Sequence, residues 1–315
     1  MHYSIIFALT LLSLIWGGSY YFIKVLLFDF GPWSIAFLRS SIGLVTITVV
    51  MIILKKPFEF KHIPWIPMII MALINTAIPW ALIGYSETKI TSSLASILNA
   101  TTPLWTIVLG IVFFKNKANL YQWFSMVIAV IGIIILLDFN PVSIVSVDII
   151  GFICMIVASL FYAIGAHLSK RLSSELSMYQ ITFGTLLSCM IGSGIIAFST
   201  ERISFSNLLL LQNVSALIGL GMFGSGIAYI LFYYIIQKGS PEIATMVTYL
   251  IPVSGIMWGT LLLNEKIKWS LLMGLALILC GIFLSSKNAQ RKTYKKKGHP
   301  DIKHFIHARL KQIRR

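Results

Sequence analysis

Most of this chain consists of apolar runs of about 20 residues, separated by short segments that hold the charges and turn-forming residues. An α-helix of that length crosses the hydrocarbon core of a bilayer, which is about 30 Å thick. Backbone donors and acceptors cannot stay unpaired in lipid, so each run is predicted to be a helix. The ten predicted spans are 4–26, 33–54, 64–86, 91–113, 119–137, 149–170, 177–198, 214–236, 241–263 and 268–285. The sequence therefore predicts an all-α membrane protein with ten transmembrane helices.

The composition excludes an ordinary soluble domain. Hydrophobic residues make up 57% of the chain and charged residues 11%, whereas soluble domains are about 45–50% apolar and about 25% charged. Because the chain lacks the charge to cover a surface in water, we expect lipid to surround most of it.

The positive charge is concentrated at the C-terminal end. Eleven of the 25 Lys and Arg lie between residues 287 and 315, alongside one acid, Asp301. Since Lys and Arg accumulate on the cytoplasmic side of membrane proteins, we expect both termini in the cytoplasm and the chain in the cell membrane. The segment 301–315 has an apolar and a basic side at helical spacing, which predicts an amphipathic helix on the anionic inner leaflet. A solvated tail is the alternative, and no nucleic-acid partner is expected.

The two halves of the chain resemble each other. An offset of 149 residues places Pro103 on Pro252 and Gly110 on Gly259 without a gap. Each copy holds five predicted spans, an odd number, so the second copy would enter the membrane from the opposite side. Inverted repeats are typical of secondary transporters, whose substrate site lies near the midplane. We assign 1–138 to the first five-helix repeat, 139–286 to the second and 287–315 to a basic cytoplasmic tail.

Several motifs carry a family resemblance. The segment Trp16-Gly17-Gly18-Ser19 is similar to the tryptophan–glycine signature of EamA-type members of the drug/metabolite transporter superfamily. Phe37-Leu38-Arg39, after Pro32, resembles the second helix of that family. The runs Thr91–Lys117 and Ser240–Lys266, each with a central proline, resemble its fourth and ninth helices.

The resemblance covers residues 4–285 and implies a ten-helix carrier of metabolites or drugs, usually an exporter. One position departs from the pattern. The second repeat has Glu265 near the end of its fourth helix, the acidic residue that the family favours, whereas the first repeat has Asn116 there.

Three prolines lie well inside the predicted spans: Pro79, Pro103 and Pro252. A proline inside a helix lacks an N–H donor, and its ring displaces the carbonyl four residues earlier. The three residues at that spacing are all polar: Asn75, Asn99 and Thr248. We interpret these positions as helix kinks around a hydrated cavity in which the three polar side chains bind a solute. The alternative is that they satisfy local carbonyls and help the helices pack.

Aromatic side chains lie at a similar depth in the predicted spans: Trp16, Tyr162, Tyr229 and Tyr249. Buried Tyr hydroxyls usually need a hydrogen-bond partner. Together with the three polar residues, these side chains are our candidate substrate-binding set, and they favour amphipathic or aromatic solutes, including amino acids. Core packing is the alternative role for Trp16.

Charged residues inside the spans are scarce. Arg39 lies one or two turns into the second span, and we interpret it as extending outward to the membrane interface, with anion binding as the alternative. Glu87, Glu242 and Glu265 lie at the ends of spans, so the sequence predicts no buried acid that carries a proton.

These features predict a secondary transporter, more specifically an exporter, of small organic solutes such as amino acids, metabolites or drugs. Neither a cofactor nor a metal is expected. The sequence contains no metal-ligand pattern, P-loop or pair of intramembrane aspartates, so an enzyme is not predicted. A non-transporting membrane scaffold and, less favoured, a membrane-embedded enzyme are the alternatives. The sequence does not determine the oligomeric state.

Overall fold

The computed structural model describes residues 3–113, 120–136, 148–238 and 247–281. Within these ranges the chain is helical and contains no β-strand. Seven helical segments are long and apolar enough to cross a membrane, and three shorter apolar helices accompany them. The prediction of an all-helical membrane protein is confirmed. The amphipathic helix predicted for 301–315 lies outside the described residues.

The helical segments follow the predicted spans closely. In the first half they are α1 (Tyr3–Leu26), α2 (Pro32–Ile53), the short 3₁₀ turn η1 (Phe60–His62), α3 (Trp65–Ala72), the π-helical η2 (Leu73–Ala77), α4 (Ile78–Glu87), α5 (Ser92–Asn99), α6 (Thr102–Val112) and α7 (Leu120–Leu136). In the second half they are α8 (Ile149–Glu175), α9 (Met178–Thr200), α10 (Phe205–Leu208), α11 (Leu211–Leu217), the π-helical η3 (Ile218–Ile227), α12 (Ala228–Lys238), α14 (Val247–Leu263) and the helix Trp269–Gly281.

The prolines inside the predicted spans have different effects on their helices. Pro79 follows η2, a π-helical stretch that includes Asn75. Such stretches relieve the hydrogen bonding that a proline disturbs and are frequent at functional sites. Pro103 lies at the start of α6, which a short turn separates from α5. Pro252 lies inside α14, which continues through it. The first half therefore contains two interruptions of regular α-helix at its proline sites.

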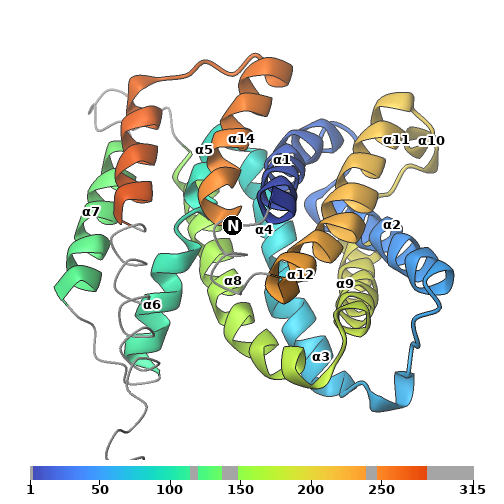
Figure 1. Cartoon of the computed structure of the whole chain (residues 1–315). Helices are drawn as coiled ribbons and strands as arrows, with labels where there is room; N and C mark the ends of the chain where they lie inside the picture. The colour runs from blue at the N-terminus through green and yellow to red at the C-terminus, as the bar shows by residue number, and fades with distance from the viewer. Residues whose placement is uncertain (1–2, 114–119, 137–147, 239–246, 282–315) are drawn as a thin grey trace, which may run out of the picture.

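Helices of the first half pack directly against helices of the second half. The extensive pairs are α1 with α14, α2 with α9 and α4 with α8. Figure 1 shows α1 near the centre of the molecule, beside α14. The approach of α1 to α14 depends on Gly17, because a Cβ there would meet the side chain of Ser254 and the backbone of Gly255. The Ser254 hydroxyl donates to the Ser13 carbonyl at 2.6 Å and ties the same two helices together.

A second close pair lies at one side of the molecule. The helix Trp269–Gly281 packs against α7, at the left of Figure 1. A Cβ on Gly132 would lie 3.0 Å from the Gly274 carbonyl oxygen. Small residues of this kind allow helix backbones to approach closely in lipid, where packing replaces the hydrophobic effect as the attraction between helices.

Candidate functional site

A cavity of about 520 Å³ lies between helices of both halves of the chain. All seven residues of the predicted substrate-binding set line it: Trp16, Asn75, Asn99, Tyr162, Tyr229, Thr248 and Tyr249. The structure thus brings together residues from six separate helical segments. Among the three prolines, Pro103 lines the cavity. Pro79 and Pro252 are buried and are not among the residues that line it.

The Trp16 side chain is held in the cavity wall by contacts with the second half. Its indole N–H donates to the Gly224 carbonyl in η3 at 3.2 Å. Its ring lies 6.3 Å from that of Tyr229, edge to face, and 5.5 Å from that of Phe232. These are favourable geometries for aromatic pairs. The wall therefore presents a fixed aromatic surface to the cavity.

The two predicted asparagines have different surroundings. Asn75, in η2, packs so closely against α8 that a Cβ on Gly165 would overlap its side chain. Asn99 is the last residue of α5, and its Oδ1 is buried with no hydrogen-bond partner among the described residues. A buried acceptor without a partner costs about 1–3 kcal/mol. Asn99 Oδ1 is therefore suited to receive a hydrogen bond from a molecule in the cavity.

Several further cavity residues follow the predicted ones at helical spacing. On α1, Ser19, Tyr20 and Ile23 also line the cavity, three, four and seven positions after Trp16. After Asn99, the residues Thr102, Pro103, Thr106 and Ile107 extend the wall in the same way. Positions i, i+3, i+4 and i+7 share one helix face. This spacing is a signal in the sequence by which these residues are recognisable.

Arg39 is a cavity residue, and its interpretation as a side chain extending outward is wrong. It is 5% exposed and lines the cavity. Its guanidinium carbon lies 3.7 Å from the centre of the Trp80 ring, and its Nε donates to the Ser225 hydroxyl at 3.3 Å. The side chain is directed inward because α4 supplies an aromatic face and η3 supplies a hydroxyl.

Glu87 contradicts the prediction that no acid is buried. It ends α4, yet its exposure is 0%. Ser92 donates its hydroxyl to Glu87 Oε2 at 2.7 Å, while Oε1 has no partner among the described residues. Lys24 donates to the main-chain carbonyls of Glu87 and Ile90. Glu87 does not line the cavity, although Ile83, one turn earlier on α4, does.

Carboxylates of the second half bind the N-termini of two helices of the first half. Glu265 accepts hydrogen bonds from the backbone N–H of Ser92 at 2.8 Å and of Ser93 at 3.0 Å, and from the Ser93 hydroxyl. Glu201 binds α2 in the same way, through the N–H groups of Trp33 at 3.0 Å and Ser34 at 2.8 Å. A helix N-terminus has unpaired N–H donors and a partial positive charge, so carboxylates are favoured there.

The contacts of Glu265 with α5 and of Glu201 with α2 lie at the same end of the bundle. A third contact between the two halves lies at this end as well. Asp29, after α1, accepts hydrogen bonds from Asn207 at 2.8 Å and Asn213 at 2.7 Å. The cavity wall nearest this end consists of buried residues, among them Tyr20 and Ile23. The wall toward the other end includes exposed Ala166 on α8. The contacts of Glu201, Glu265 and Asp29 therefore hold the two halves together at this end of the cavity.

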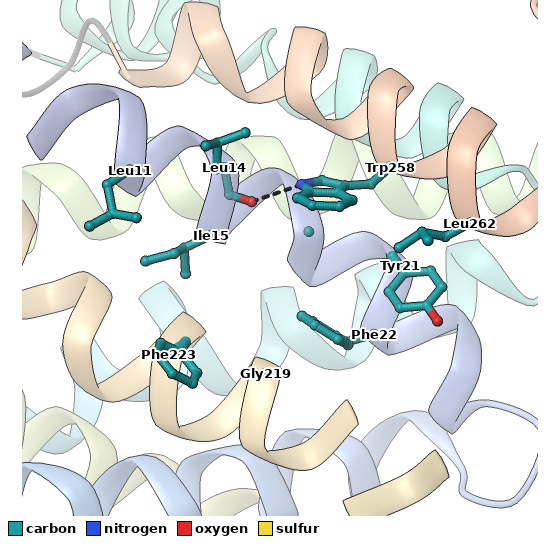
Figure 2. Close-up of a pocket in the computed structure, with 10 residues that line it drawn as sticks. Leu11, Leu14, Ile15, Tyr21, Phe22, Gly219, Phe223, Trp258 and Leu262 are labelled. Atoms are coloured by element: carbon teal, nitrogen blue, oxygen red, sulfur yellow. Dashed lines mark hydrogen bonds between the residues drawn. The ribbon is translucent and has the colours of Figure 1, made fainter. Parts of the chain in front are cut away.

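A second pocket, of about 330 Å³, is different in character. It lies between α1, η3 and α14 and is lined mainly by aliphatic and aromatic side chains, as Figure 2 shows. Its polar indole N–H, on Trp258, already donates to the Leu14 carbonyl at 3.1 Å. This pocket offers a small apolar surface, whereas the larger cavity also offers amides, hydroxyls and a charge.

Comparison with family models identifies one family. The model of the EamA-like transporter family matches this chain twice, at residues 3–138 and 149–287. The chain is 23% identical over 280 residues to the uncharacterized transporter YoaV of Bacillus subtilis, covering 89% of this chain and 96% of YoaV. It is 26% identical over 270 residues to the uncharacterized inner membrane transporter YedA of Escherichia coli K12, covering 83% and 85% of the two chains.

A solved crystal structure has the same fold, with a TM-score of 0.66 at 13% identity over 92% of this chain and 99% of that one. The two matches to the family model together span most of the sequence. The chain is therefore a multi-pass membrane protein that belongs to the EamA-like transporter family.

Proposed function

We propose that this protein is a secondary transporter that moves small organic solutes, such as amino acids, metabolites or drugs, outward across the cytoplasmic membrane by alternating access. The observation that carries the proposal is the cavity of about 520 Å³, lined by helices from both matches to the family model. Secondary transporters built from inverted repeats bind substrates at such an interface. Membership of a transporter family supports solute movement in general.

The proposed architecture consists of ten transmembrane helices in two inverted five-helix repeats, 1–138 and 139–286, followed by the basic tail 287–315. The double match to one family model supports a repeat. An odd number of spans per copy inverts the second copy. The positive charge after residue 286 supports cytoplasmic termini, and the same segment is proposed to contact anionic lipid.

In the proposed binding site, aromatic and polar side chains have separate roles. The rings of Trp16, Tyr162, Tyr229 and Tyr249 would contact the apolar part of a solute, whereas Asn75, Asn99 and Thr248 would form hydrogen bonds with its polar groups. The buried, unpartnered Oδ1 of Asn99 supports this division. It favours solutes with at least one N–H or O–H donor.

The asymmetry of the cavity supports alternating access. We infer that the end where Glu201 and Glu265 join the two halves is the closed one, since the wall toward the other end reaches exposed Ala166. Under the proposed orientation, the open end faces the cytoplasm. Separation of the two carboxylates from α2 and α5 would then open the outer end and release the solute.

Reconstitution in liposomes tests this function. Labelled amino acids, nucleosides and cationic dyes are offered with and without a pH gradient, and at least one class is expected to move faster than in empty liposomes. A scaffold would move none of them, and that result would overturn the proposal.

Alanine substitutions test the binding residues in the same assay. Asn75→Ala and Asn99→Ala are each expected to weaken transport about fivefold, because a net hydrogen bond contributes about 1 kcal/mol. Membrane abundance should not change. Ser199→Ala is the control, since Ser199 is exposed and its hydroxyl bonds to the Ile196 carbonyl outside the cavity. Transport at the wild-type rate in both asparagine variants would exclude them from the site.

A further inference from the structure

The cavity contains one charged residue among the described residues that line it, Arg39. No Asp, Glu or Lys is among those lining residues. Charged side chains within membrane spans are rare and commonly mark the path of a substrate or ion. The cavity therefore has a positive electrostatic character that its other, neutral side chains do not offset.

The neighbours of Arg39 fix its position without neutralising it. The Trp80 ring covers one face of the guanidinium at 3.7 Å, and the Ser225 hydroxyl accepts from Nε at 3.3 Å. An arginine side chain has five N–H donors, so this leaves most of its hydrogen-bonding capacity at the outer edge of the guanidinium. The first contact uses the face of the group and the second uses Nε. Among the described residues no hydrogen bond involves its two terminal nitrogens, which supports a role in which they meet a ligand.

No counter-ion for Arg39 is present in the described part of the chain. No carboxylate there lies within ion-pair distance of it. The ionisable groups that interact with it electrostatically are neutral in their usual state: Tyr162, Tyr229, Cys189 and Tyr20. Glu87, the buried acid at the end of α4, is outside the cavity and is bonded to Ser92. A buried cation without a counter-ion is costly, so an anion in the cavity would be strongly favoured.

We infer that Arg39 binds the carboxylate of the transported solute, so that the substrate class is small organic acids with an apolar or aromatic body, including zwitterions. A carboxylate accepts two parallel N–H donors from a guanidinium. A single cation matches one negative charge, which favours a monocarboxylate over a doubly charged phosphate. The apolar body would lie against Trp16 and its aromatic neighbours. This inference rests on the proposed transport function.

Two matched probes test it. Binding of 3-phenylpropionate and of its neutral methyl ester, which like the carboxylate has no N–H or O–H donor, is measured by titration calorimetry on the full-length protein in phosphatidylcholine nanodiscs. We expect the carboxylate to bind at least about tenfold more tightly than the ester, a difference in line with a charge-assisted hydrogen bond. Arg39→Gln should abolish this preference, and Arg39→Lys should retain part of it.

The controls separate the possible explanations. Lys89→Gln removes the same charge from an exposed site on the surface, where Lys89 pairs with Asp148 at 3.7 Å, and should leave the preference intact. Equal binding of the two probes to the wild type, or an undiminished preference in Arg39→Gln, would overturn the inference. Competition by added phosphatidylglycerol would assign Arg39 to a lipid headgroup and would also overturn it.

The proposed function is judged separately. If the wild-type protein moves a member of the solute panel but binds both probes equally, transport stands and the role of Arg39 is lost. If no member of the panel moves, the transport function itself fails. The Arg39→Lys variant keeps the test meaningful if Arg39→Gln does not fold.

Discussion

Two tryptophans show how one type of contact serves different purposes. Trp16 and Trp258 each donate an indole N–H to a backbone carbonyl of a neighbouring helix, at 3.2 and 3.1 Å. Trp16 lines the large cavity, whereas Trp258 lines the smaller apolar pocket of Figure 2. The two residues therefore form a matched pair. Replacing either one removes the same kind of hydrogen bond, but only Trp16 lines the cavity proposed to bind the solute.

Phenylalanine substitutions use this pair. Trp16→Phe and Trp258→Phe should each lower the free energy of unfolding by about 1 kcal/mol, because a backbone carbonyl loses its donor. Only Trp16→Phe should also raise the KM for solute transport. Thermal unfolding in detergent and transport in liposomes measure the two effects. An equal rise of KM in both variants would mean that Trp16 acts through stability alone.

The sequence predicts the cavity residues best where a local rule applies. The sequence predicts Asn75 and Asn99 because a proline four residues later disturbs their carbonyls. The predictions for Arg39 and Glu87 are wrong because the burial of these residues depends on distant segments: Trp80 and Ser225 for Arg39, and Lys24 on α1 for Glu87. Distance from a helix end along the sequence does not reveal such neighbours.

At the scale of helices, the contact between α1 and α14 depends on small residues. A Cβ on Gly17 would overlap Ser254 and lie 2.9 Å from the backbone nitrogen of Gly255. A Cβ on the adjacent Gly18 would have its nearest neighbour, Trp258 Nε1, at 3.4 Å, which is an ordinary contact. The first contact involves backbone that cannot move without displacing α14.

Alanine at these two glycines gives a prediction for the helix pair. Gly17→Ala should destabilise the protein by about 1–3 kcal/mol, the usual range for overpacking, whereas Gly18→Ala should be close to neutral. Thermal unfolding of the two purified variants provides the comparison. Equal stability would show that α1 and α14 are not in tight contact in the membrane.

The helices themselves were predictable because the thickness of the bilayer fixes their length. The π-helical stretches within them were not predictable in the same way. The π-helical η2 includes the predicted site residue Asn75 and is followed by Pro79. The π-helical η3 carries the Gly224 carbonyl and the Ser225 hydroxyl but contains no proline from which it could be predicted. Such a stretch arises where packing and hydrogen bonding across the bundle favour a wider turn.

At the scale of the whole molecule, function depends on the two ends of the cavity opening in turn. One end of the cavity is held by contacts between residues far apart in the sequence, such as Ser93 on α5 and Glu265 after α14. No local pattern predicts this contact, although the family resemblance singled out Glu265. If access alternates, the contact must break in every transport cycle.

A reversible cross-link at this contact tests the central claim most directly. Ser93→Cys and Glu265→Cys are introduced together after Cys154, Cys189 and Cys280 are replaced by alanine, and a short bis-methanethiosulfonate joins the new pair. The fastest-moving solute of the liposome panel is then measured, with the single-cysteine variants as controls. We predict that the cross-linked protein falls to the rate of empty liposomes and recovers when a reductant cleaves the link. Transport at the same rate with the link intact would contradict alternating access through this cavity.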